Sequence, residues 1–272
     1  HARSIPTIAL AHSGFMNWDL GIVSETMAVW GEGQRTRIQG GVNRIVVTGS
    51  PKYDDWQRPR EKSRDDYAEQ AASLSNSDFT VLVVTAATNI LPVKYDPAVH
   101  MRALRAIAKM PSRIEDVEVV FKPHPRYDIY DVYENIKQEE LPGVELADRS
   151  VALQDILPQI QMALLVDIPT TAALEAILSG APTFYFCPAW HKEFDNGFNQ
   201  KTEGAYQDMV VRDLNQLEER ILQLKTDSQE RTRIKSVNES FLHHWVGDLD
   251  GKATARTAKL IASIASRKQI PH

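Results

Sequence analysis

Short apolar runs alternate with longer amphipathic stretches along the whole chain. The stretches PAVHMRALRAIAKM and TTAALEAILSG place apolar residues three and four positions apart, which predicts helices. The runs VLVV, VEVVF and MALLV are continuous, as is typical of parallel strands buried on both faces. This alternation predicts an α/β fold, a Rossmann-like parallel sheet with helices on both faces. The predicted strands are Ile5–Leu10, Thr26–Trp30, Arg44–Thr48, Phe79–Ala86, Val117–Lys122, Val144–Leu146, Met162–Val166, Pro182–Phe186 and Met209–Val211.

One seam divides this pattern. Residues 51–64, PKYDDWQRPREKSR, combine prolines with dense charge and predict a linker or an exposed loop. Too few strands precede the seam for a complete α/β domain, whereas enough follow it. We therefore expect a partial α/β domain over residues 1–60, a complete one over 61–250 and a closing helix over 251–272. Because the chain starts with His and enters a strand almost at once, we also expect it to be a piece of a longer protein.

Composition narrows the classes of function. The chain has 272 residues and a formal net charge of −5, which argues against nucleic-acid binding by broad phosphate neutralisation. Its single cysteine, Cys187, excludes an internal disulfide and a cysteine-based zinc cluster. No G-x-G-x-x-G follows a strand, no Walker A loop occurs, and no His pair has the spacing of a catalytic zinc site. No apolar run reaches the roughly 20 residues of a membrane-spanning helix. We expect a cytoplasmic protein, with the inner face of the membrane as an alternative.

In open parallel sheets, ligands bind beyond the carboxyl ends of the strands. The strand VVFK is followed there by PHPRYD, in which Lys122, His124 and Arg126 alternate. The two prolines favour an extended chain, which directs these three side chains to one side. The pattern therefore predicts a clamp for a diphosphate. The alternative interpretation is that His124 is an ordinary turn residue.

The segment DIPTTAALEAILSGAP predicts a second part of this site. Thr170 and Thr171 stand where a helix begins, so that hydroxyls and free amides can bind phosphate. Glu175 lies one helical turn further on and can accept hydrogen bonds from a ribose diol. The alternative is a plain helix cap, with a threonine at the start and Gly180 at the end. That alternative leaves Glu175 unexplained on a helix of Ala, Leu and Ile.

Two further strand exits carry polar residues. The loop ATNILP brings Thr88 and Asn89 to the same predicted edge. The first strand ends in His12, Ser13 and Gly14, where a histidine of near-neutral pKa is suited to act as a general base. An ordinary loop histidine is an equally good interpretation of His12.

Four motifs in order resemble the GT-B glycosyltransferase superfamily. They are VVTGSPxYD, a strand ending in KPHP, D-x-x-T-T opening a helix with E-A-x-x-x-G-x-P, and the tail DGKATARTAKLI. The chain looks most like bacterial surface-polysaccharide enzymes of capsule, lipopolysaccharide or teichoic acid synthesis, including CDP-glycerol glycerophosphotransferases. The resemblance covers roughly residues 5–265. It implies that residues 1–60 are the tail end of an acceptor-side domain, that 61–250 bind the nucleotide donor, and that 251–272 pack back across the hinge.

The resemblance also implies roles for matching positions. His124, Thr170 and Thr171 would hold the donor phosphates, and Glu175 the ribose. His12 would match a histidine proposed as general base. Asp167 lies eight residues before Glu175, a spacing like that of a paired acidic motif in other GT-B enzymes, and we include it among the donor-binding residues.

These observations predict a metal-independent transferase without a cofactor. It would move a group from a nucleotide sugar or CDP-linked donor to a glycan or lipid-linked acceptor of the bacterial surface. The expectation includes no nucleic-acid partner, and it admits peripheral membrane association through parts of the protein outside this sequence. One alternative is an enzyme like the non-hydrolysing UDP-N-acetylglucosamine 2-epimerases. Another is a non-catalytic domain that binds a nucleotide sugar.

Overall fold

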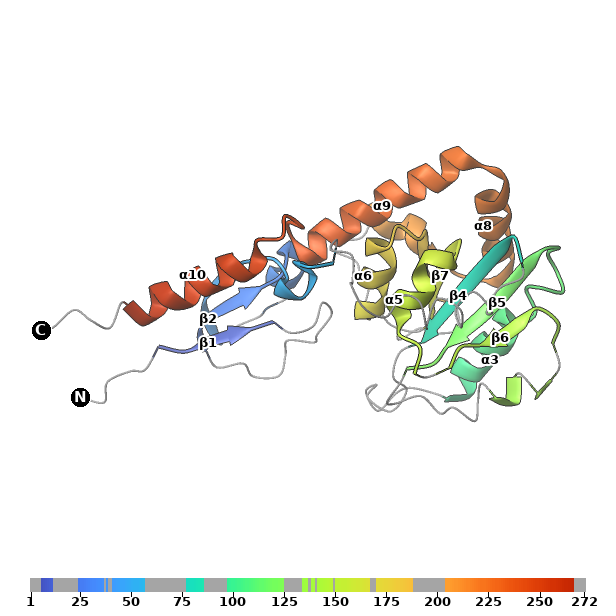
Figure 1. The fold of residues 1–272 in the computed structure, drawn as a ribbon, viewed down its shortest axis with the longest axis horizontal. Helices are drawn as coiled ribbons and strands as arrows, with labels where there is room; N and C mark the ends of the chain where they lie inside the picture. Colours follow the sequence, from blue (N-terminus) through green and yellow to red (C-terminus); the bar gives the residue numbers. More distant parts are fainter. Residues whose placement is uncertain are drawn as a thin grey trace, which may run out of the picture. The chain divides into compact units, whose positions relative to one another are not determined.

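The computed structural model divides the chain into two compact units (Figure 1). The first unit contains His1–Pro59 and Ser240–His272, and the second unit contains Arg60–Glu239. The structure describes residues 6–11, 24–36, 38, 41–56, 77–85, 97–124, 134–136, 138–139, 141–148, 150–166, 170–187 and 204–266. Among these, no helix has the length and apolar character to cross a membrane.

The second unit is built on a six-stranded parallel sheet. Its spatial order is β6-β5-β4-β7-β8-β9, so the chain starts in the middle, runs to one edge, and then returns to fill the other side. This is the Rossmann strand order, with its topological switch point between β4 and β7. The strands are β4 (Phe79–Thr85), β5 (Val117–Lys122), β6 (Val144–Leu146), β7 (Met162–Val166), β8 (Thr183–Phe186) and β9 (Val210–Val211). The predicted fold class is thereby confirmed.

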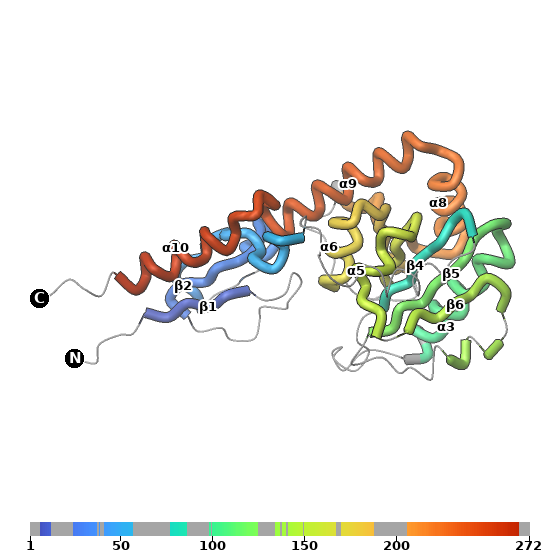
Figure 2. The backbone as a smooth tube through the Cα atoms, in the orientation of Figure 1, coloured from blue at the N-terminus to red at the C-terminus, as the bar shows by residue number. Residues whose placement is uncertain are grey.

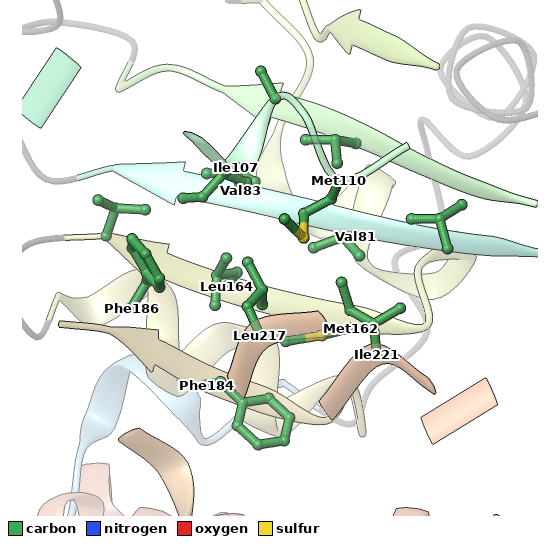
Figure 3. Packing of buried hydrophobic residues seen from close by; sticks show 14 of the residues in the cluster. Val81, Val83, Ile107, Met110, Met162, Leu164, Phe184, Phe186, Leu217 and Ile221 are labelled. Atoms are coloured by element: carbon green, nitrogen blue, oxygen red, sulfur yellow. The ribbon is translucent and has the colours of Figure 1, made fainter. Parts of the chain in front are cut away.

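Helices cover both faces of this sheet. On one face, α3 (Pro97–Ile107) and α8 (Leu214–Thr226) contribute to a large apolar cluster. Figure 3 shows side chains of β4, β7 and β8 directed toward Leu217 and Ile221 of α8. The strand residues that point the other way, such as Leu82 and Leu165, are also buried. Helix α6 (Thr171–Leu178) lies along β7 and β8 with α5 (Leu153–Ile156) beside it, and its buried residues lie outside that cluster.

Short 3-10 turns and one long helix complete the second unit. The turns are η2 (Leu157–Gln159) and η3 (Gly204–Met209). Helix α9 (Ser228–Val246) contains residues of both units, because the division falls between Glu239 and Ser240. Within the second unit, the Asn238 side chain of α9 bonds both the amide and the carbonyl of Thr183, at 2.8 and 3.0 Å. These two bonds fix α9 to the start of β8.

The first unit contains a smaller parallel sheet of order β1-β2-β3. Its strands are β1 (Ile8–Leu10), β2 (Ser24–Val29) and β3 (Val42–Val47), with α1 (Glu32–Arg35) after β2 and η1 (Pro51–Tyr53) after β3. Helix α10 (Ala253–Ser266) runs alongside β2 (Figure 2). Its residues Leu260 and Ile264 pack against Ala28 of β2. The final helix therefore covers one face of this sheet.

Two sequence motifs join α10 to the end of β3. The Asp54 carboxylate accepts hydrogen bonds from the amides of Ala253 and Thr254, at 2.9 and 2.6 Å. Partial burial works against the charge of Asp54, but the bonds from Thr254 and Ala253 and the charge of Arg256 outweigh it, so the pKa of Asp54 lies below its ordinary value. Arg256 donates through Nε to the Thr48 carbonyl at 2.7 Å. The motifs TGSPxYD and DGKATAR thus link α10 to the segment that follows β3.

Candidate functional site

The carboxyl ends of β5, β4 and β7 lie side by side at one edge of the larger sheet. In the strand register, Lys122 pairs with Val84, and Val84 pairs with Leu165. The exits of β5 and β7 therefore flank the exit of β4, about 10 Å apart at the usual strand spacing. This edge, at the switch point, is where ligands bind in open α/β sheets. The predicted residues that the structure describes come from these two exits and from α6.

Lys122 is the last residue of β5 and is only 5% exposed. Its ammonium donates a hydrogen bond to the Asp148 carbonyl, at an Nζ–O distance of 3.2 Å. A buried ammonium needs such acceptors, because burial without them is costly. The Lys122 charge is therefore held within the edge of the sheet and anchored to the loop that follows β6.

The loop after β6 closes on itself. The Asp148 carboxylate accepts hydrogen bonds from the Ser150 amide at 2.7 Å and from the Ser150 hydroxyl at 2.6 Å. These two bonds, with a smaller contribution from the Lys122 charge, hold the pKa of Asp148 below its ordinary value although desolvation opposes them. The turn keeps the Asp148 carbonyl in place for Lys122.

His124 follows two residues after the end of β5 and is half-buried. Pro123 between them is buried. The exit of β5 therefore contributes one buried lysine and one partly accessible histidine to the edge of the sheet.

The amino end of α6 carries a threonine that does not cap it. Thr170 occupies the N-cap position in an extended conformation (φ −122°, ψ 163°), and its side chain makes no capping hydrogen bond. Its hydroxyl is buried and has no hydrogen-bond partner among the described residues. The sequence therefore predicted correctly that Thr170 is the N-cap residue. The prediction that its side chain caps the helix is wrong.

Helix α8, in the same unit, has an N-cap residue whose side chain is hydrogen-bonded to the first turn. The Asp213 carboxylate accepts hydrogen bonds from the amides of Asn215 and Gln216, both at 2.9 Å. At α6, the backbone carbonyl of Thr170 accepts a hydrogen bond from the Ala173 amide at 3.0 Å. The preceding amides of the first turn have no intrahelical acceptor, as at the start of any helix. Such amides, together with the helix dipole, form an anion-binding site.

Glu175 and Thr171 lie on α6, one turn apart, and both are half-buried. Their neighbours Ala173, Leu174 and Ala176 are buried against the sheet. Glu175 is thus a half-buried carboxylate on a helix whose buried residues are apolar.

The remaining predicted residues lie outside the described part of the chain. They are His12, Thr88, Asn89, Arg126 and Asp167. Among the described residues, no three or more His, Cys, Asp or Glu side chains are grouped in a way that could hold a metal ion.

Two features of this edge were not predicted from the sequence. The first is the Asp148 carbonyl that anchors Lys122, for which a backbone group gives no signal in the sequence. The second is Arg212, which follows β9 and places its Nη1 atom 3.5 Å from the sulfur of Cys187, the residue that follows β8. A cation directly after the strand MVV could have been noticed by the rule applied to Lys122.

Comparisons with known proteins show the fold. No protein-family model matches the chain, and no curated protein sequence matches it. The solved structures that are similar over almost the whole chain include the following three. The S. aureus MnaA–UDP co-structure is 12% identical with a TM-score of 0.59, and it covers 90% of this chain and 62% of MnaA. A UDP-N-acetylglucosamine 2-epimerase is 16% identical with a TM-score of 0.52, covering 92% of this chain and 60% of the other.

The third structure is a variant of the wall teichoic acid polymerase TagF, 11% identical with a TM-score of 0.52, covering 90% of this chain and 59% of TagF. The chain thus spans about three fifths of the length of each of these proteins. It has the Rossmann-like fold of the GT-B glycosyltransferases and UDP-N-acetylglucosamine 2-epimerases.

Proposed function

We propose that the protein is a glycosyltransferase-type enzyme that moves a group from a nucleotide-activated donor to a bacterial surface polysaccharide. The second unit binds the donor. One observation carries the proposal: Thr170 makes no side-chain capping bond at the amino end of α6, and this end follows β7, across the exit of β4 from Lys122. This arrangement offers amides and a positive charge to an anion at the switch point.

The donor phosphates lie between the two flanking exits. The first-turn amides of α6 and the hydroxyls of Thr170 and Thr171 donate to the phosphate oxygens, and His124 approaches from β5. The Thr170 hydroxyl supports this assignment, because a buried hydroxyl without a partner is costly and a phosphate oxygen would satisfy it. Lys122 adds positive charge from within the sheet edge.

The remaining roles follow from the chemistry of transfer. Glu175 accepts hydrogen bonds from the ribose diol, and Thr88, Asn89, Arg126 and Asp167 complete the donor site. An acceptor hydroxyl attacks the activated carbon or phosphorus of the donor, and His12 removes its proton. The nucleotide phosphate leaves with the bonding electrons, and the helix dipole and cationic groups stabilise its charge without a metal ion.

A second candidate is a 2-epimerase of nucleotide sugars. The similarity to a solved UDP-N-acetylglucosamine 2-epimerase favours it. The two functions differ in one measurable respect, because an epimerase acts on a nucleotide sugar without an acceptor. Incubating the intact protein with UDP-N-acetylglucosamine alone, and following the sugar by NMR, separates them: an epimerised sugar nucleotide favours the second candidate.

The donor class is tested first by thermal shift with CMP, CDP, UDP, GDP and TDP and their sugar or glycerol conjugates. A ligand that binds only the native state raises the melting temperature. We expect at least one nucleoside diphosphate to do so. If none of them does, the donor-site proposal is wrong.

The role of His124 is tested by His124→Ala, with His243→Ala on the exposed face of α9 as the matched control. We expect donor affinity to fall about tenfold in the first variant, as for one lost hydrogen bond to a charged group, and to stay unchanged in the second. Equal affinity and turnover in both variants would exclude His124 from the site.

A further inference from the structure

The first unit has a pocket of its own at the carboxyl ends of its strands. The pocket has a volume of about 330 Å³ and is lined by residues that follow or end β1, β2 and β3, and by Thr257 of α10. Ala28 and Trp30 are 3% exposed and form its apolar interior, whereas Leu10, at the end of β1, is 50% exposed. A volume at the lower end of the range for ligand pockets suits a small molecule.

Trp30 is held in one orientation at this pocket. Its indole Nε1 donates to the Ala11 carbonyl at 3.0 Å, and its backbone amide donates to the Gln34 side chain at 2.6 Å. Its ring meets Tyr53 edge-on, with ring centroids 5.7 Å apart. The aromatic wall is therefore preorganised, which reduces the entropy lost when a ligand binds.

Thr257 is the exception in the buried stripe of α10. The other members of that stripe are Ala253, Leu260 and Ile264, and Thr257 itself is only 8% exposed. Its hydroxyl is buried and has no hydrogen-bond partner among the described residues. An apolar residue would fill this position without the cost of an unsatisfied hydroxyl.

Two other helical threonines of this protein form hydrogen bonds within their own helices. Thr226 donates to the Leu222 carbonyl at 2.9 Å and Thr232 to the Ser228 carbonyl at 3.0 Å, each four residues back along its helix. Thr257 makes no such bond. Threonine adopts two side-chain rotamers in helices, so a rotation about one bond exchanges its methyl and hydroxyl groups at the pocket wall. A polar atom of a ligand can accept a hydrogen bond from this hydroxyl.

Lys52 supplies positive charge at the same pocket. It lines the pocket, is exposed, and holds its ammonium 5.2 Å from the centre of the Tyr53 ring. An anionic group is therefore favoured at this side of the pocket, next to an apolar interior.

We propose that this pocket binds a small amphipathic anion, with an apolar tail against Leu10, Ala28 and Trp30 and an acidic head group that reaches Lys52 and the Thr257 hydroxyl. The site belongs to the first unit alone and does not depend on the function proposed for the second.

The test uses octanoate as the probe, below its micelle concentration, and calorimetry with the whole chain. Octyltrimethylammonium, with a similar tail and the opposite charge, is the matched probe. We expect saturable binding of octanoate and weaker binding of the cation. Octanoate that does not saturate, or binds no better than the cation, would overturn the proposal.

Three substitutions, each with a control, locate the site. Thr257→Val is expected to weaken octanoate binding about fivefold, with Thr232→Val as control. Lys52→Gln is expected to weaken it about threefold, with Lys259→Gln of α10 as control. Leu10→Ser removes part of the apolar wall of the pocket and is also expected to weaken octanoate binding. Its control is Ile261→Ser, which changes an exposed apolar residue that does not line the pocket. Octanoate affinity unchanged by all three pocket substitutions would show adventitious binding and overturn the proposal.

A stability measurement on the same variants distinguishes a ligand site from a merely structural threonine. Thr257→Val retains shape and removes the unsatisfied hydroxyl, so we expect octanoate affinity to fall while the melting temperature stays equal or rises. A lower melting temperature, with octanoate affinity kept, would assign Thr257 a structural role and overturn its place in the site.

Discussion

Helices α6 and α10 begin in opposite ways. The first turn of α10 receives the Asp54 carboxylate, which accepts hydrogen bonds from two of its amides. The first turn of α6 follows Thr170, whose hydroxyl bonds to none of the described residues. Both helix ends carry the same partial positive charge. At α10 the protein itself neutralises that charge and gains stability. At α6 the N-cap side chain does not, and there we propose that the phosphates of a ligand bind.

The largest effect is expected when α6 receives a capping carboxylate like the one at α10. Thr170→Asp places a negative charge where we expect a phosphate, so nucleoside diphosphate affinity should fall at least about a hundredfold in calorimetry. The same change should raise the free energy of unfolding by about 0.5 kcal/mol, because aspartate is a better cap. Thr170→Asn supplies a cap without charge and should lose less affinity. Undiminished affinity in the aspartate variant would contradict the donor site.

The reverse change removes the carboxylate from α10. Asp54→Ala should lower the free energy of unfolding by about 2 kcal/mol in urea, because two charge-assisted bonds are lost. The pKa of Asp54 is depressed in the folded state, so its contribution is present above the unfolded pKa of about 3.9 and is lost as the pH falls through the lower folded value. The difference between wild type and variant should therefore shrink in acid. A pH-independent difference would show that the charge is not responsible.

A finer change separates amides from hydroxyls at α6. Proline is tolerated at the first helical position, and Thr170 before it is already extended, so Thr171→Pro should fold while deleting one amide donor. Thr171→Ala deletes the hydroxyl and keeps the amide. We expect the proline variant to bind a nucleoside diphosphate about tenfold more weakly than the alanine variant. Equal affinities would show that this amide does not contact the ligand.

The smallest expected effect concerns the buried Thr257 hydroxyl, which has no hydrogen-bond partner among the described residues. Thr257→Val should raise the free energy of unfolding by about 0.5 kcal/mol, because it removes a buried polar group without a partner. Thr226→Val should not, because its hydroxyl already bonds to the Leu222 carbonyl. Urea unfolding of both variants compares them directly, and destabilisation by Thr257→Val would reveal a bond that the folded structure needs.

The sequence predicted the larger sheet closely because its strands are continuous apolar runs. β5, β6 and β7 have the predicted bounds to the residue. The smaller sheet was less predictable: β2 begins at Ser24 rather than Thr26, because Ser24 pairs with Val42 although neither its polarity nor that of Glu25 signals a strand. Backbone pairing, rather than hydrophobicity, sets that boundary.

The candidate site was predictable in position but not in detail. The exits of β5 and β7, and hence the places of Lys122 and Thr170, followed from the strand pattern. The Lys122 bond to a backbone carbonyl could not be predicted, because every residue has a carbonyl and only the folded loop selects that of Asp148. The unsatisfied Thr170 hydroxyl could not be predicted either, because Thr before a helix ordinarily indicates a cap.

The close approach of Arg256 to Gly49 restricts how this protein can be recombined. Gly49 has φ +80°, and a β-carbon there would lie 2.7 Å from an Arg256 Nη2 atom. The Arg256 side chain cannot easily move away, because its guanidinium also donates hydrogen bonds to both carboxylate oxygens of Asp250 at 2.8 Å. A chimera that takes its last helix from another parent must therefore take the segment around Thr48 and Gly49 from that parent too, although 208 residues separate Thr48 from Arg256 along the chain.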